Sequence, residues 1–213
     1  MTPDAIAHEF DHQVETLIQK DYPTAAHLST KEFLLLIDPL KKNLANIPSQ
    51  DIDMHTGYLP FVIVVKSSLV SSEDAMGKIS RQEHAGITKL APLVPVDFSS
   101  IESVDIPNKT IYLLIDIDRG RESLNIRPQD ALITIQEATR SPLTIDEGIA
   151  IVTQYPEFLM RNNCFSLLAS RHKGDKRVPA IWINGKNHPN LGWCWDGNPH
   201  TWLGSASGKK RLA

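Results

Sequence analysis

Hydrophobic residues first recur at the spacing of an amphipathic helix, in two successive segments. One helix is predicted over residues 4–20, and Tyr22-Pro23 ends it because the residue before a proline avoids helical angles. The second begins at Ser29, where Glu32 completes a capping box, and Pro39 is expected to end or kink it. The apolar positions on the two helix faces are Ile6, Phe10, Val14, Leu17 and Ile18, then Phe33, Leu36, Ile37 and Leu40.

The pattern then changes to continuous apolar runs. Phe61–Val65 and Ile111–Ile117 are typical of strands that are buried on both faces. Before the first run, residues 46–58 are expected to form a loop. Between the runs we expect a short helix over residues 71–79, then irregular chain with short edge strands over residues 86–107, which contain three prolines.

Helical patterns return in the second half, followed by short strands. Helices are predicted over Pro128–Thr139 and from Thr144 to about Tyr155, the latter opened by a capping box with Glu147. The tail Gly204–Ala213 is small, polar and basic, and we expect it to fray. Three strands are predicted over Cys164–Leu168, Val178–Ile183 and Leu191–Trp195, with turns at Gly174-Asp175 and Asn184-Gly185.

These elements predict one α+β domain over residues 1–213. Its parts are an N-terminal helical pair within residues 1–48, a mixed central β-sheet with helices, and a tryptophan-rich C-terminal β unit; the sheet-containing core covers residues 58–213. A chain of this length can bury an ample core without metals or disulfides.

Composition and charge narrow the classes of function. The formal net charge of −3 provides no general field that favours nucleic acid or an acidic membrane. The N-terminus is polar and acidic, and no apolar run approaches the roughly 18 residues of a membrane helix. The two cysteines form no CxxC motif, which favours a reducing compartment. We therefore expect a cytoplasmic protein with no nucleic-acid or membrane partner.

The segment richest in tryptophan is His188–Ser205, which contains Trp193, Trp195 and Trp202, together with Cys194 and His200. Tryptophan offers a large apolar surface and one N–H group that needs a partner when buried. Such a cluster builds either a core or the wall of a binding site, and the sequence alone leaves both open.

His8, Glu9 and His12 match the H-E-x-x-H pattern, in which two histidines bind zinc and the glutamate activates water. The match lies close to the N-terminus, Asp11 adds a charge inside it, and no third ligand stands at an obvious spacing. The pattern therefore favours a solvated helix face, and no metal site is predicted.

Asp116 and Asp118 leave the second apolar strand, where alternation would place both carboxylates on one face for a ligand or a hard cation such as Mg²⁺. The alternative is a strand-ending turn in which Arg119 and Arg121 pair with these carboxylates, and we favour this alternative.

Cys164 is a candidate nucleophile, because a nearby histidine or positive charge lowers the pKa of a thiol. His172, His188 and His200 are the histidines in the same part of the sequence. However, Cys164 opens an apolar run, which is typical of a buried, inert cysteine, and the same holds for Cys194 between two tryptophans. The pattern favours packing roles for both.

A long and specific pattern covers four C-terminal segments, namely Asn163–Leu168, Arg177–Trp182, Leu191–Trp195 and Gly197–Ser207. This pattern resembles an uncharacterised bacterial family known only as a domain of unknown function. The resemblance implies no activity and transfers no catalytic residue, and His8 and His12 lie outside its pattern. Looser similarity to the same family is found at Asp11–Leu17, Tyr22-Pro23, Asp118–Glu122 and Ser141–Gly148.

Two hypotheses of function follow. The first is an enzyme or small-molecule-binding protein with a C-terminal pocket lined by tryptophan and histidine, for which hydrolysis or group transfer is the candidate chemistry. The second is a non-catalytic interaction module that presents an aromatic patch, and self-association is compatible with it. No cofactor is identified. The candidate catalytic residues are Cys164, His200 and Asp118, and the candidate ligand-binding residues are Asn163, Trp193, Trp195, Asn198 and Trp202.

Overall fold

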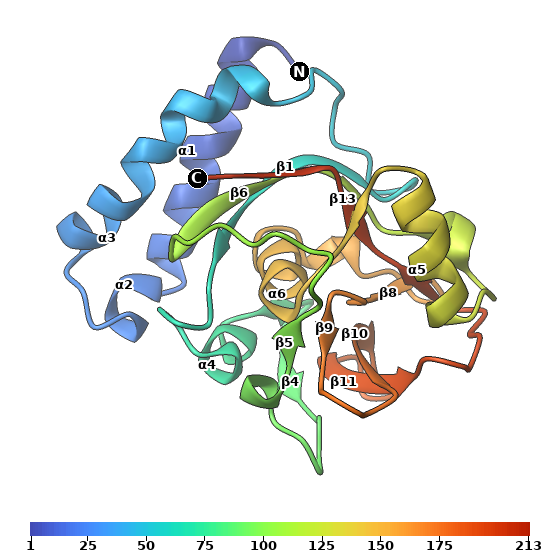
Figure 1. The fold of residues 1–213 in the computed structure, drawn as a ribbon. Helices are drawn as coiled ribbons and strands as arrows, with labels where there is room; N and C mark the ends of the chain where they lie inside the picture. Colours follow the sequence, from blue (N-terminus) through green and yellow to red (C-terminus); the bar gives the residue numbers. More distant parts are fainter.

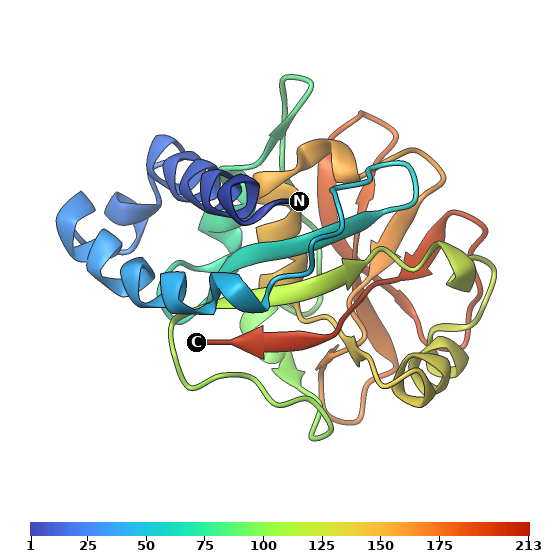
Figure 2. The same cartoon turned by 90° about the horizontal axis from the view of Figure 1, so that it is seen from above.

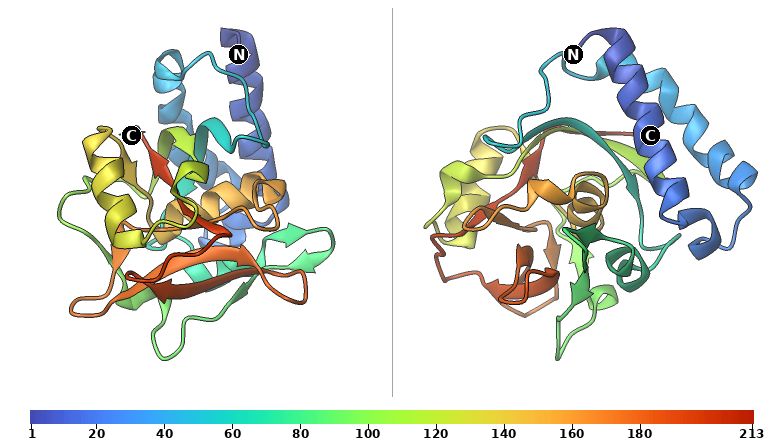
Figure 3. Two further views of the ribbon diagram at one scale, coloured as in Figure 1. Left: turned by 90° about the vertical axis from the view of Figure 1, so that its right-hand side faces the viewer. Right: turned by 180° about the vertical axis from the view of Figure 1, so that it is seen from behind.

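The computed structural model describes all 213 residues, and it confirms the α+β class. Two five-stranded sheets pack on either side of one buried helix (Figures 1 and 3). The buried hydrophobic residues form one continuous cluster that reaches from Ile6 to Ala206. Both the N-terminal helices and the C-terminal strands contribute to this core.

The first sheet contains both of the strongly apolar strands and is antiparallel throughout. Every residue of β1 after Tyr58 is buried, and so are the first five residues of β6, as their unbroken apolar runs predict. The strand order is β1 (Tyr58–Val65), β6 (Ile111–Asp118), β13 (Ser207–Gly208) and β7 (Ser141–Pro142), with β14 (Lys210–Leu212) also paired to β6.

The second sheet is mixed, because its two outer strands run parallel to their neighbours. Its strand order is β12 (Leu203–Ser205), β8 (Cys164–Ser166), β10 (Arg177–Ile183), β11 (Pro189–Trp195) and β4 (Ile87–Thr88). The remaining strands form two small ladders, β2 (Ser80–Arg81) with β3 (His84–Ala85) and β5 (Ser99–Ser100) with β9 (Ser170–Arg171).

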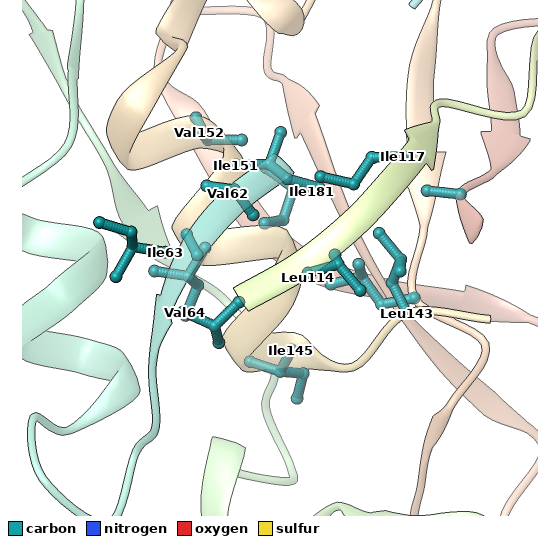
Figure 4. Packing of buried hydrophobic residues seen from close by; sticks show 14 of the residues in the cluster. Val62, Ile63, Val64, Leu114, Ile117, Leu143, Ile145, Ile151, Val152 and Ile181 are labelled. Atoms are coloured by element: carbon teal, nitrogen blue, oxygen red, sulfur yellow. The ribbon is translucent and has the colours of Figure 1, made fainter. Parts of the chain in front are cut away.

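Helix α6 (Ile145–Gln154) is the element that joins the two sheets. All of its residues except Asp146 are buried, because it contacts β1 on one side and β10 on the other. Figure 4 shows its Ile151 and Val152 packed among Val62 of β1 and Ile181 of β10. Thr144 and Glu147 form the predicted capping box at its N-terminus. This buried helix makes the two sheets one core.

The predicted N-terminal helices are confirmed, and they cover the free edge of β1 (Figure 2). Ser29 and Glu32 form the predicted capping box, and the α-helix ends at Ile37, after which the chain around Pro39 continues as a 3-10 helix. The helices are α1 (Pro3–Gln19), α2 (Tyr22–Ala25) and α3 (Thr30–Ile37), followed by η1 (Asp38–Asn46).

Gln13 shows how α1 seals the edge of the first sheet. Its Oε1 accepts a hydrogen bond from Ile63 N–H at 2.9 Å, and its Nε2 donates to the Phe61 carbonyl at 3.4 Å and to the Tyr155 hydroxyl at 2.9 Å. The side-chain amide thus takes the place of a neighbouring strand at an otherwise open edge.

The prediction that the tail Gly204–Ala213 frays is wrong. It forms β13 and β14 on the first sheet, and Arg211 binds the fully buried carboxylate of Glu147 at 2.6 and 2.9 Å. The Tyr112 hydroxyl donates to the same carboxylate at 2.9 Å. A buried ion pair and two strand pairings therefore order the tail, although its composition is typical of a disordered terminus.

The remaining helices surround the two sheets. Helix α4 is shorter than the predicted residues 71–79, whereas α5 lies where Pro128 predicts its start. They are α4 (Ser72–Gly77), η2 (Pro95–Asp97), η3 (Arg121–Ser123), α5 (Pro128–Glu137) and η4 (Pro156–Phe158).

Candidate functional site

The β10–β11 hairpin brings three of the four tryptophans together. It turns at the predicted Asn184-Gly185, and its register places Arg177 opposite Trp195 and Trp182 opposite Asn190. Gly192 has no side chain, and this makes room for the Trp182 ring: a Cβ atom there would lie 2.2 Å from Cη2 of Trp182. Trp202 comes from the segment just before β12.

The aromatic rings of this surface form two groups. Trp182 and His200 both contact Trp202, with ring centroids 6.0 and 5.2 Å from it. Trp193 and Trp195 contact each other edge to face at 5.1 Å. Such tilted and edge-on contacts are the arrangements that aromatic pairs prefer, so the rings support one another.

A hollow of about 350 Å³ lies between these rings, and we call it the tryptophan hollow. Trp195 is 41% exposed at its rim. The structure therefore brings His200 together with all four of the aromatic and amide residues that the sequence analysis places in the C-terminal segment. Its lining consists of Trp182, Trp193, Cys194, Trp195, Asn198, His200, Trp202 and Leu203.

His200 is the only histidine that lines this hollow. Partial burial lowers the pKa of its imidazole, so the neutral form is favoured near neutral pH. Its Nε2 is buried and has no hydrogen-bond partner within the protein. A neutral imidazole with an unpaired nitrogen can accept or donate one hydrogen bond to a ligand.

Arg177 packs on the rings of Trp193 and Trp195 and restricts their movement. Its guanidinium lies 4.7 Å from the Trp193 ring centroid and 5.1 Å from that of Trp195. Asp175 holds the same guanidinium through an ion pair and also caps the Arg177 backbone N–H. The cation–π contact and the ion pair together fix the two tryptophans in place.

Cys164 does not share the tryptophan hollow with His200. It lines a separate hollow of about 300 Å³, which also has Trp182 and Trp202 in its lining. Burial raises the pKa of its thiol, and its Sγ lies 3.3 Å from the Met160 carbonyl. Burial also raises the pKa of Cys194 to about 11. Both thiols are thus kept protonated, as the packing interpretation expects.

Asp118 lies in a third hollow and does not meet either Cys164 or His200 there. Asp116 has a left-handed φ of 56° and pairs with Arg140 at 2.9 Å, so the two carboxylates do not act as a pair. The expected pairing with Arg119 and Arg121 is wrong. Arg119 turns inward, is fully buried, and donates to the carbonyls of Met54, His55 and Phe158.

The histidines of the H-E-x-x-H match lie on the exposed face of α1. Glu9 is instead engaged by the Tyr155 hydroxyl, next to the buried amide of Gln13. The structure contains no group of three or more His, Cys, Asp or Glu residues that could hold a metal ion. Glu9 therefore helps to dock α1 on the core.

Asn163 stands apart from the tryptophan hollow, although its Oδ1 is buried without a partner. Two residues of the site were missed by the sequence analysis, namely Trp182 and Arg177. Both could have been predicted from the Asn184-Gly185 turn. This turn folds Val178–Ile183 back on Leu191–Trp195 and so pairs the residues on the two strands.

Residues 16–213 match the sequence model described as "Family of unknown function (DUF5701)". No curated protein matches the chain, and no solved structure does. No helix combines the length and apolar character needed to cross a bilayer.

Proposed function

The chain belongs to this family of unknown function, and we propose that it binds a small molecule in the tryptophan hollow. The observation that carries the proposal is the placement of His200, with its unpaired Nε2, among four tryptophan rings around one hollow. Mostly apolar hollows with a few polar groups are the usual form of small-molecule sites.

The lining indicates the chemistry of the ligand. Indole rings bind flat apolar faces by stacking, such as the face of a sugar ring or of a heteroaromatic ring. The Asn198 amide and the His200 imidazole can each take a hydrogen bond from a polar edge. The favoured ligand is therefore uncharged, with one flat face and a polar edge.

Binding is better supported than hydrolysis or group transfer through the predicted catalytic residues. Cys164, His200 and Asp118 line three different hollows, and the pKa of the Cys164 thiol is raised. A thiol nucleophile is activated by a base within hydrogen-bond reach or by a lowered pKa, and Cys164 has neither. If the protein is catalytic, the chemistry must come from other groups around His200.

Saturation-transfer NMR against a library of monosaccharides and small heteroaromatic compounds tests the proposal. We expect members of one class to bind the wild-type protein and to lose most of that binding in His200→Gln and Trp202→Phe variants. Loss of one hydrogen bond to a ligand corresponds to about a three- to tenfold weaker affinity.

His12→Gln is the matched control, because His12 is exposed on α1 with a side-chain accessibility of 62%. It should bind like the wild type. If compounds bind the wild type and all three variants equally, the tryptophan hollow is not the site, and the proposal fails.

A second candidate function is docking of a partner surface, including a second copy of the chain. A broader hollow of about 750 Å³ adjoins Trp182 and Trp193, and Val94 in its lining is 48% exposed. Nearby in sequence, Val96 is 81% exposed. Exposed apolar patches of this kind mark interaction sites in many proteins. Concentration-dependent self-association that Val96→Asp abolishes would favour this candidate.

The cytoplasm is the location we infer for this activity. Cys164 and Cys194 are both free thiols in the structure, and free buried thiols are typical of proteins from reducing compartments.

A further inference from the structure

The third hollow, which Asp118 lines, has a volume of about 340 Å³ and lies where the chain crosses from one sheet to the other; we call it the seam hollow. The crossing segment runs from β12 in the second sheet to β13 in the first, and α5 lies beside it (Figure 1). The turn after β6 closes the remaining side through Asp118, Gly120 and Glu122.

The inner part of the seam hollow is apolar. Ala131 and Ile135 of α5 are almost fully buried, and Ile126 is 42% exposed at the side. These side chains can cover a short hydrocarbon chain and remove it from water, which stabilises a complex in proportion to the apolar area that is buried.

Two serine hydroxyls line the wall. Ser205 and Ser207 are only 3% and 4% exposed, and their spacing of two residues along an extended segment directs both toward the hollow. Ser207 Oγ accepts a hydrogen bond from Arg140 Nε at 2.8 Å. The Ser205 hydroxyl makes no hydrogen bond within the protein, whereas its backbone N–H donates to Ser123 Oγ at 2.7 Å. A nearly buried, unpaired hydroxyl in the wall of a hollow is a group prepared for a ligand.

The uncompensated charge of the seam hollow is negative. Asp118 and Glu122 are exposed at its rim and form no ion pair, and Asp118 uses only Oδ1, which accepts the Gly120 N–H at 2.6 Å. Arg140 is the cation of the lining, but Asp116 and Ser207 already hold its guanidinium. Arg121 stands between the two acids in sequence, yet it neither lines the hollow nor pairs with them.

We propose that the seam hollow binds an organic ammonium ion with a short alkyl chain. The chain lies on Ile126, Ala131 and Ile135, and the ammonium group donates hydrogen bonds to the carboxylates of Asp118 and Glu122. The Ser205 hydroxyl accepts a further hydrogen bond from it. An alkylammonium ion keeps its charge at neutral pH, since a primary amine of this kind has a pKa of about 10.4. A metal ion fits less well, because no third acidic or imidazole ligand joins the two carboxylates.

An NMR titration of the labelled full-length protein with n-hexylammonium chloride tests this site. 1-Hexanol and hexanoate serve as probes of equal chain length without positive charge. We expect saturable shifts of the Ala131 and Ile135 amide signals with hexylammonium, weaker shifts with hexanol, and the weakest with hexanoate. Added salt should weaken hexylammonium binding and leave hexanol binding unchanged, because screening acts on the charge alone.

The double variant Asp118→Asn with Glu122→Gln should bind hexylammonium roughly tenfold more weakly while binding hexanol as before. Glu137→Gln, which changes an exposed carboxylate on α5 outside the hollow, is the matched control and should bind like the wild type. The proposal is overturned if the double variant retains full affinity, if hexanoate binds as well as hexylammonium, or if hexylammonium gives no saturable shift at up to about 10 mM. None of these outcomes depends on the tryptophan hollow.

Discussion

The two sheets of this protein differ in what lies against them. At the first sheet, the Gln13 amide closes the free edge of β1. The carboxylate of Glu147, from helix α6, accepts hydrogen bonds from Arg211 and Tyr112 of this sheet and from the Thr144 N–H. In the second sheet, a hollow lined by tryptophans remains beside β10 and β11. The first sheet is organised for stability, and the second leaves surface available for binding.

Unpaired buried polar atoms follow the same division. Eight side-chain atoms in the protein are buried without a hydrogen-bond partner, and four of them lie on the second sheet or on the segments just before its strands. Native proteins keep few such atoms, so a concentration of them indicates a functional surface. The four belong to Thr88, Asn163, Arg177 and His200.

The comparison predicts that substitutions in the first sheet lower stability most. Arg211→Ala should lower the free energy of unfolding by about 3–5 kcal/mol, because it leaves the buried Glu147 carboxylate without its cation. Chemical denaturation measures this loss. Lys210→Ala changes the exposed neighbour in the same strand and should cost less than about 0.5 kcal/mol. Equal losses in the two variants would contradict the structural role of the tail.

A substitution where the chain crosses between the two sheets should cause the next largest loss of stability. In Gly204→Ala, the new Cβ would lie 2.2 Å from the Gly120 carbonyl oxygen, and neither backbone can yield easily. We expect a loss of about 3 kcal/mol, at the upper end for overpacking. Gly197→Ala is the control, since a Cβ there meets no atom within 4 Å, and it should be neutral or slightly stabilising. Thermal unfolding of both variants measures the two changes in stability.

Opening the edge of the first sheet should have a moderate effect. Gln13→Ala removes the partners of Ile63 N–H and the Phe61 carbonyl, and unpaired buried groups cost about 1–3 kcal/mol. Gln19→Ala, on the same helix but exposed, should change stability by less than about 0.5 kcal/mol. Hydrogen exchange of the Ile63 amide should also accelerate in Gln13→Ala, and unchanged protection would show that the edge is closed by other groups.

The second sheet should show the smallest effect on stability, in the form of a pH dependence. The pKa of His200 is lowered in the folded protein, so the unfolded chain binds a proton first as the pH falls below the ordinary value of 6.5. Protonation therefore favours unfolding, and the stability that the neutral imidazole contributes above pH 6.5 is lost as the pH falls toward its folded pKa. The difference in stability between the wild type and His200→Gln should shrink from pH 7.5 to pH 5.0, as followed by denaturation at each pH.

Local patterns predicted the elements well, because caps, prolines and apolar runs act within a few residues. Ser29 with Glu32 and Thr144 with Glu147 open helices where expected, and the two apolar runs are β1 and β6. The tail was misjudged because its order depends on Glu147, which lies 64 residues earlier. No local pattern reports a partner at that separation.

Prediction of the candidate site from local sequence patterns has the same limit. The tryptophan segment and His200 were found from sequence because they are close together along the chain. Trp182 was missed because hairpin register brings it to the hollow, and Cys164 and Asp118 were grouped with His200 although they line separate hollows. Spacing along the chain cannot tell which of several neighbouring hollows a side chain enters.

The four tryptophan side chains provide the most direct test of the division between the two sheets. Each indole N–H gives its own NMR signal, and all four tryptophans line the tryptophan hollow. When a bound fragment from the sugar or heteroaromatic library is added to the wild-type protein, we predict saturable shifts of the Trp202 and Trp182 indole signals, with the amides of β1 and β6 unmoved. Shifts confined to the first sheet or to α1–α3, with all four indole signals unchanged, would contradict the assignment of binding to the second sheet.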